Sequence, residues 1–138
     1  MSIRDFKPHQ VGLRKVLGDL EADIMDVIWE KDRVMVRDVH RELLTRRELA
    51  YTTVMTVMGR LVDKGILVRE PVGNAYAYMA VDSRQDFMDQ VAREVVDGLM
   101  AEFAEPALSH FVHCLACEEN EQSLVQLEDL IRQTRASD

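Results

Sequence analysis

The spacing of hydrophobic residues changes within the first half of the chain, and this change constrains the fold more than any other feature. Segments 18–31, 35–47 and 51–65 carry apolar residues three and four positions apart, which is the period of a helix with one buried face. After Gly65, which suits the left-handed end of a helix, the runs ILVRE and AYAYMA have β-type composition and flank the turn-forming sequence PVGN. We therefore expect three helices followed by a small β-hairpin.

Three helices and a two-stranded ribbon are the layout of a winged helix-turn-helix domain, in which the third helix enters the major groove and the hairpin is the wing. We place this domain at residues 17–81, after a flexible basic arm at residues 1–16. Residues 82–138 return to helical spacing. The predicted fold is mainly α with a small β-hairpin wing: an N-terminal winged helix-turn-helix domain and a C-terminal helical dimerisation region.

The outer face of the third predicted helix has a composition that suits DNA better than solvent. Opposite its apolar stripe lie Thr52, Thr53, Met55, Thr56, Gly59 and Arg60. Threonine is a poor helix former, but its hydroxyl can hydrogen-bond to base edges or phosphates and its methyl can contact thymine. No carboxylate occurs between Glu48 and Asp63 to repel phosphate. Arg46 and Arg47 precede the helix, where they can reach the DNA backbone. The alternative is that the first two threonines only cap the helix.

Charge is distributed unevenly along the chain. The formal net charge is −8, but residues 1–81 carry 13 basic and 12 acidic side chains, whereas residues 82–138 carry 4 and 13. DNA repels an acidic region, so residues 82–138 are expected to lie away from it. This region has apolar helix faces but too few residues to bury them by itself, which favours pairing with a second copy of the chain.

Helix signals divide the C-terminal region into further helices. The start signals are Ser83 with Asp86, Pro106 in a first turn, and Asn120 as a cap. The predicted dimerisation residues share helical spacing and are Phe87, Val91, Val95, Leu99, Phe103, Leu108, Phe111, Val112, Leu115, Leu124, Leu127 and Ile131.

The segments LGDLEADIMDVIW, VRDVHRELL, LAYTTVMTVMGRLVDKGIL and NAYAYMA resemble the penicillinase-repressor family (BlaI/MecI/CopY), strongly over residues 17–81 and loosely over the helical tail. The most specific run, AYTTVMTVMGRLVDKG, is similar to the recognition helix of these homodimeric winged-helix repressors. The resemblance implies that Thr53, Thr56 and Arg60 contact operator DNA, with Thr52 and the wing beside them. It also implies that the C-terminal helices build the dimer.

These observations predict a transcriptional repressor that binds a palindromic operator in double-stranded DNA as a homodimer and is released by an inducing signal. The predicted DNA-binding residues are Arg46, Thr52, Thr53, Thr56, Arg60, Lys64, Asn74 and Tyr76. The resemblance also suggests β-lactam-linked proteolysis as that signal, with a membrane sensor protease as partner. Antibiotic-responsive relatives are cut in an Asn-Phe context, and the nearest match is the bond between His110 and Phe111.

The stretch HFVHCLAC places His110, His113, Cys114 and Cys117 at helical positions i, i+3, i+4 and i+7, along one face. One straight helix cannot easily close four side chains around a single tetrahedral ion, so any pair is a half-site that needs other ligands. Copper-responsive relatives carry Cys-x-Cys elements, whereas this chain has one Cys-x-x-Cys. We predict no cofactor or metal. A metal- or redox-responsive repressor using these four residues stays as an alternative, as does a winged-helix protein-interaction module without DNA binding.

Sequence motifs of enzymes are absent from the chain, which has no P-loop, G-x-S-x-G, H-E-x-x-H or Gly-rich dinucleotide loop. Cys114 with His110 lacks an orienting carboxylate, so we do not predict an enzyme. His40, beside Arg41 and Glu42, is expected to be a solvated polar residue. The charged N-terminus and the interrupted apolar runs predict a cytoplasmic protein without membrane insertion.

Overall fold

The computed structural model of the protein describes residues 17–117 and 121–137. The predicted basic arm and the predicted cap at Asn120 lie outside the described residues. The chain divides into two compact units, one ending at Val95 and one beginning at Val96. No helix in the described ranges is both long and apolar enough to cross a membrane.

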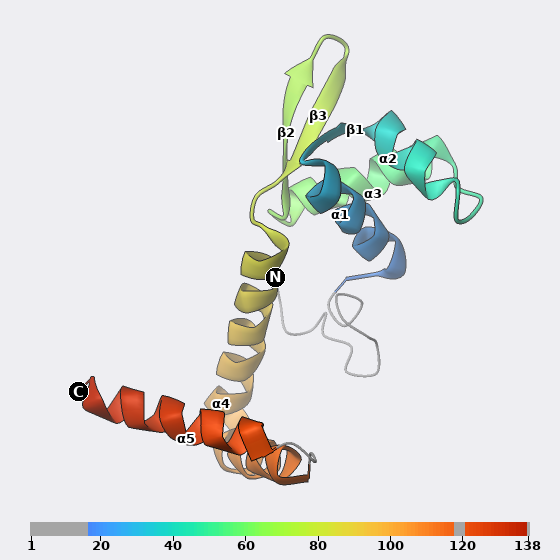
Figure 1. The fold of residues 1–138 in the computed structure, drawn as a ribbon. Helices are drawn as coiled ribbons and strands as arrows, with labels where there is room; N and C mark the ends of the chain where they lie inside the picture. The colour runs from blue at the N-terminus through green and yellow to red at the C-terminus, as the bar shows by residue number, and fades with distance from the viewer. Residues whose placement is uncertain (1–16, 118–120, 138) are drawn as a thin grey trace. The chain divides into compact units, whose positions relative to one another are not determined.

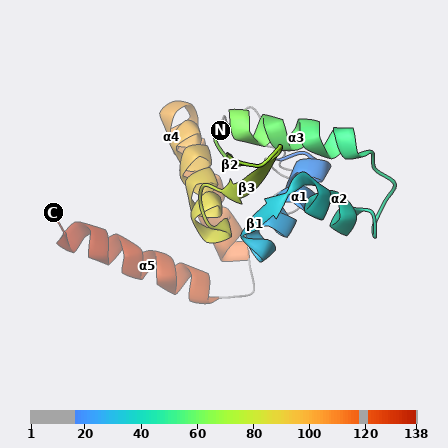
Figure 2. The ribbon, with the colours of Figure 1, turned by 90° about the horizontal axis from the view of Figure 1, so that it is seen from above.

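The first unit contains the predicted helices and hairpin (Figure 1). Its elements are α1 (Asp19–Lys31), β1 (Arg33–Met35), α2 (Val36–Leu43), α3 (Tyr51–Asp63), β2 (Leu67–Val72), β3 (Ala75–Ala80) and the first turns of α4 (Arg84–Cys117). The helices α1, α2 and α3 pack on one another, and α3 lies across the unit in Figure 2. The predicted mainly α fold with a hairpin wing is confirmed.

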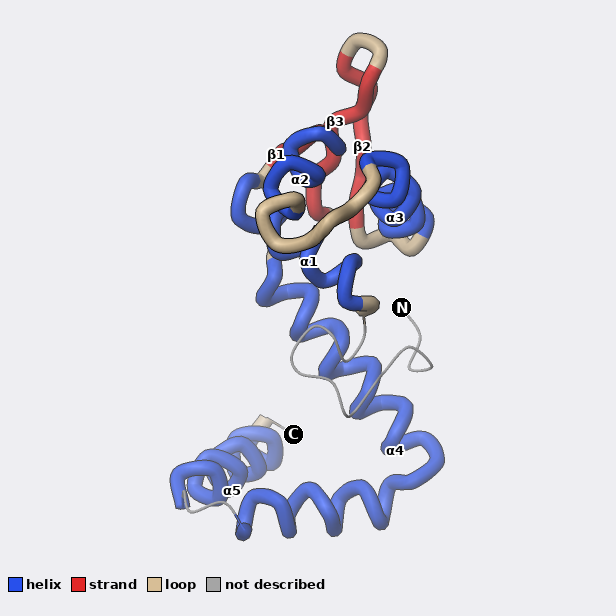
Figure 3. Tube along the Cα trace, turned by 90° about the vertical axis from the view of Figure 1, so that its right-hand side faces the viewer, coloured by secondary structure: helices blue, strands red, loops and turns tan. Residues whose placement is uncertain are grey.

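The sheet has three antiparallel strands in the order β1-β3-β2, one more than the predicted hairpin. Strand β1 pairs Val34 with Tyr78 of β3, and β2 pairs Arg69 with the same tyrosine. Figure 3 shows β2 and β3 running together to the turn at the tip of the wing. A three-residue strand is too short to display a period of two, so the hydrophobic pattern did not reveal β1.

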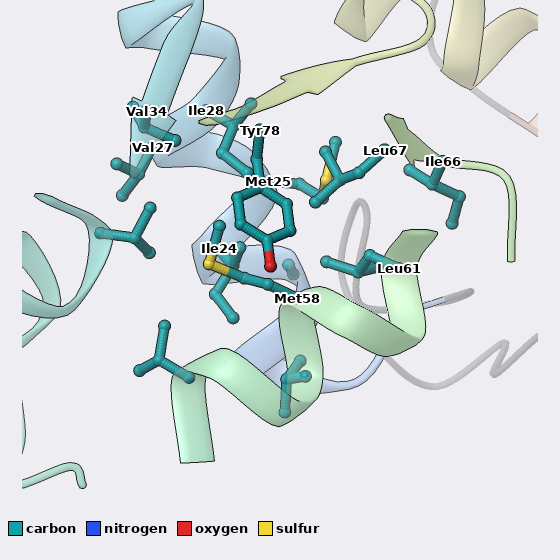
Figure 4. Packing of buried hydrophobic residues seen from close by; sticks show 14 of the residues in the cluster. Ile24, Met25, Val27, Ile28, Val34, Met58, Leu61, Ile66, Leu67 and Tyr78 are labelled. Atoms are coloured by element: carbon teal, nitrogen blue, oxygen red, sulfur yellow. The ribbon is translucent and has the colours of Figure 1, made fainter. Parts of the chain in front are cut away.

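The core of the first unit is formed by one face of each helix and the inner face of the sheet. Ile24 and Ile28 of α1, Met58 and Leu61 of α3, and Leu67 of β2 are almost completely buried. Figure 4 shows Tyr78 among these side chains, between the two helices. Each such side chain contributes roughly 1.5–3 kcal/mol through burial. This core fixes the orientation of α3 and therefore decides which of its residues face outward.

The ends of the helices follow from local chemistry. Helix α2 begins after Met35, where the Asp38 carboxylate accepts a hydrogen bond from the Met35 N–H at 2.9 Å. It ends at Leu43, four residues before the predicted limit. Helix α3 is closed by Gly65, whose φ of +79° is the left-handed conformation predicted for it.

The start of α4 is attached to α1 through Trp29. Its indole Nε1–H donates to the carbonyl oxygen of Asp82 at 2.9 Å, and its ring centre lies 5.6 Å from that of Phe87. The Arg84 guanidinium lies 5.1 Å from the centre of the indole ring and forms an ion pair with Asp26 at 2.5 Å. These contacts pack the first turns of α4 into the first unit.

Three residues that we predicted for dimerisation belong to this attachment. Phe87 and Val91 are buried in the core of the first unit, and Val95 is partly buried against it. Their burial therefore requires no second copy of the chain. The division between the compact units accordingly follows Val95, fourteen residues beyond the predicted domain boundary at 81.

The second unit consists of the rest of α4 and of α5 (Glu121–Ala136). Helix α4 bends at Phe103, which leaves the helical conformation with φ −127° and ψ 35°. The bend precedes Pro106, which has no N–H to donate and clashes with the carbonyl of the residue four positions before it. Phe103 thus separates two helical segments of α4, and the second corresponds to the helix predicted to carry Pro106 in its first turn.

Candidate nucleic-acid interface

Helix α3 presents a polar face that the core leaves open. Val54, Val57, Met58 and Leu61 are buried, whereas Thr52, Thr53, Met55, Thr56 and Arg60 are exposed. The Thr56 hydroxyl donates to the Thr52 carbonyl at 2.9 Å. Its oxygen can still accept a hydrogen bond, and its methyl group is available to a thymine methyl. We call the five exposed residues the α3 outer face.

The alternative that the threonines only cap α3 is wrong. The residue at the N-cap is Ala50, and α3 begins at Tyr51. Thr52 and Thr53 therefore occupy the second and third helical positions. No acidic residue lies in the first turn, so the positive end of the helix dipole is not neutralised there. A phosphate or an electronegative base edge would be favoured at this end.

The two arginines before α3 have different environments. Arg46 is exposed in the loop between α2 and α3, where a phosphate could reach it. Arg47 instead forms an ion pair with Asp23 of α1, whose side chain is only 11% exposed. The expectation that both arginines face DNA is therefore corrected for Arg47, which holds the loop to α1.

Lys64, at the C-terminal end of α3, is also paired within the chain. Its Nζ lies 3.0 and 3.2 Å from the two carboxylate oxygens of Glu21. The Lys64 side chain is 39% exposed and that of Glu21 is 18% exposed. The ammonium therefore reaches solvent at the end of α3 while it is paired with Glu21.

His40 supports the start of α3, a role that the sequence did not suggest. Its Nε2 lies 2.6 Å from the Leu49 carbonyl oxygen, and its ring packs edge-on against Tyr51 with centres 5.7 Å apart. The expectation of a solvated histidine is wrong, because these contacts tie α2 to the loop that leads into α3. The partners lie nine and eleven positions away, beyond any local pattern that we used.

The wing carries a second basic and aromatic group. Tyr76 is 45% exposed, and the Arg69 guanidinium lies 4.6 Å from the centre of its ring. A side-chain hydrogen bond with Tyr78 raises the pKa of Arg69, which favours the charged guanidinium. Asn74 follows Gly73, whose φ of +61° forms the turn at the wing tip. Arg69 was missed as a candidate, although its place in the predicted wing could have indicated it.

The fold and the site together define a winged helix-turn-helix protein of the DNA-binding class. Three packed helices are followed by an antiparallel wing, and the third helix exposes hydroxyl and guanidinium groups. The sequence model of the penicillinase repressor family matches residues 17–133. The chain belongs to this family, and the resemblance drawn from its sequence is confirmed.

The chain is similar to several named regulators and to one solved DNA-binding domain. The transcriptional regulator BlaI of Mycobacterium tuberculosis is 39% identical over 120 residues, which cover 81% of this chain and 85% of that protein. A penicillinase repressor of Bacillus licheniformis is 26% identical over 73 residues, covering 53% and 57%. A solution structure of the DNA-binding domain of the repressor BlaI is 27% identical, with a TM-score of 0.46, and covers 51% of this chain and 85% of that one.

Proposed function

We propose that the protein is a transcriptional repressor that binds a palindromic operator as a homodimer, with α3 in the major groove and the wing beside it. The observation that carries this proposal is the α3 outer face, which is exposed, rich in threonine and free of carboxylates up to Asp63. The family and the name of the relative in Mycobacterium tuberculosis support the same function.

Residues of the α3 outer face would contact the base edges. Arg60 can donate two hydrogen bonds to one guanine, a contact that discriminates against the wrong base by about 1–3 kcal/mol. Thr53 and Thr56 can place methyl groups against thymine and hydroxyls against polar edges, with Thr52 at the groove margin.

A second set of side chains would position the domain on the DNA backbone. These are Arg46 in the loop, Lys64 at the end of α3, and Asn74 and Tyr76 in the wing. Such contacts fix orientation and register without reading sequence. The Arg69 guanidinium on the Tyr76 ring brings positive charge to the same part of the wing.

Exposed apolar residues of the second unit support the homodimer. The two arms of the bent α4 enclose an apolar groove of about 260 Å³, which we call the α4 groove, lined by Val96, Leu99, Met100, Ala107, Leu108 and Phe111. Leu108 and Phe111 are 57% and 53% exposed. An apolar surface of this kind marks an interaction site, and a second copy would cover it by two-fold symmetry.

The other predicted dimerisation residues of this unit differ in exposure. Phe103, Val112 and Ile131 are exposed, whereas Leu115, Leu124 and Leu127 are partly buried. We propose that the exposed residues extend the interface around the α4 groove. The partly buried ones would support the helices behind it.

Release by an inducing signal completes the proposal. If a membrane sensor protease acts on the protein, we propose the bond between His110 and Phe111 as its target. This bond lies within α4, and Phe111 lines the α4 groove. A protease needs extended substrate, so the helix must first open locally. Cleavage would then divide the proposed dimer surface.

The function is tested by binding to the protein's own promoter region. A footprint should cover an inverted repeat whose half-sites are separated by about one helical turn, roughly 10 base pairs or a multiple of it. Affinity should fall steeply with salt, because phosphate contacts release bound cations. Equal affinity for promoter and unrelated DNA, or a complex insensitive to salt, would contradict the proposal.

A further inference from the structure

One group of histidine and cysteine side chains in α4 has no part in the proposed DNA or dimer contacts. His110, His113, Cys114 and Cys117 are all exposed, and helical spacing places them along one face. Phe111, which lines the α4 groove, lies about 160° around the helix from His113 and about 120° from Cys117. His113 and Cys117 therefore lie away from the groove and would stay accessible when a second copy covers it.

Two of these four side chains already lie at the spacing of metal ligands. The Nε2 atom of His113 and the Sγ atom of Cys117 form a hydrogen-bond contact and are 3.4 Å apart. Zinc bonds of about 2.0–2.1 Å to nitrogen and about 2.3 Å to sulfur, opened to a tetrahedral angle, separate these two atoms by roughly 3.5 Å. Linear coordination with the same bond lengths would place the nitrogen and sulfur atoms about 4.3 Å apart. The observed distance matches the tetrahedral arrangement without any change in the helix.

The chemistry of the two donors agrees with this geometry. Neutral imidazole and thiolate bind zinc in preference to the alkali and alkaline-earth ions. On binding, the Cys117 thiol would lose its proton to solvent and form a metal–sulfur bond, while His113 would donate the lone pair of Nε2. Both side chains are exposed, so the ion can enter from solvent.

The structure limits the site to part of a coordination sphere. Among the described residues, no group of three or more histidine, cysteine, aspartate or glutamate side chains is placed to hold a metal. We propose that His113 and Cys117 form a two-ligand site for a tetrahedral, thiolate-binding divalent cation of the zinc type, with water in the open positions. This inference is independent of DNA binding.

Cobalt(II) is the probe for this site, because a tetrahedral cobalt–thiolate complex absorbs in the visible and near-ultraviolet and zinc is silent. The untagged full-length protein, reduced without a chelating thiol, is titrated with cobalt(II) and then with zinc. We expect a sulfur-to-cobalt charge-transfer band and tetrahedral ligand-field bands, which zinc then removes. Aspartate and glutamate at the surface cannot produce the sulfur band.

Matched variants assign the signal to the two residues. Cys117→Ser should abolish the charge-transfer band, and His113→Gln should markedly weaken cobalt binding. Cys114→Ser and His110→Gln, at residues with the same i, i+4 spacing three positions earlier in the helix, should leave the band in place. Circular dichroism confirms that each variant keeps its helices. Absence of the band in the unmodified protein, its survival in Cys117→Ser, or equal loss in Cys114→Ser would each overturn the proposal.

Discussion

Arg46 and Arg47 show that adjacent residues of identical chemistry can have different tasks. The guanidinium of Arg47 forms an ion pair with Asp23, whose side chain is 11% exposed, whereas Arg46 is exposed in the loop before α3. The sequence could not separate them, because the ion pair spans 24 positions and depends on how α1 and the loop fold together.

This difference gives a prediction with an internal control. Arg47→Ala removes the ion pair with the largely buried Asp23 carboxylate and should lower the free energy of unfolding by about 1–2 kcal/mol, since Arg47 itself is 39% exposed. Arg46→Ala should leave stability unchanged but weaken DNA binding. It should also reduce by about 1 the slope of the logarithm of the binding constant against the logarithm of the salt concentration. Urea unfolding and fluorescence anisotropy at several salt concentrations measure the two effects. The opposite pattern would assign the phosphate contact to Arg47.

At the scale of elements, the long periodic helices and the hairpin were predictable from the sequence. Helix α3 carries its buried stripe over three turns, and Gly65 marks its end within two residues of the observed one. The strand β1 and the contacts of His40 and Trp29 were not predictable. A three-residue strand shows no period, and these two side chains find partners through tertiary packing.

The exposure of the α3 outer face was predictable for the same reason. A strict apolar stripe on one side of a helix defines which residues must lie on the other, and Thr53, Thr56 and Arg60 are exposed as expected. For Arg69, the predicted wing could have indicated the position but not the exposure of the side chain, which depends on how the sheet packs. Its contact with Tyr76 appears only once β2 and β3 are paired.

Two glycines of this region should respond to alanine in opposite directions. Gly65→Ala forces a side chain into a left-handed conformation and should destabilise the protein by about 1 kcal/mol. Gly59→Ala lies within α3, and a Cβ there meets no atom within 4 Å, so it should stabilise by up to about 1 kcal/mol. Thermal unfolding compares the variants. A stabilising Gly65→Ala would disprove the assigned cap.

For the whole molecule, the proposed homodimer depends on the α4 groove. Phe111→Asp places a charge in a surface that a second copy should cover, and we expect a monomer with strongly reduced affinity for the operator. Ser109→Asp adds the same charge at an exposed position on another side of α4 and should remain dimeric. Sedimentation equilibrium measures the mass. A dimeric Phe111→Asp protein would exclude this groove as the interface.

The central claim is that the α3 outer face reads DNA, and the affinity of one double variant tests it most directly. The dissociation constant for the promoter region is measured for the unmodified protein and for Thr53→Ala/Arg60→Ala, with Arg93→Ala on α4 as a control for lost charge. We predict that the double variant binds the promoter no better than unrelated DNA while keeping its fold and its mass in solution. Unchanged promoter affinity in a folded double variant would contradict the account.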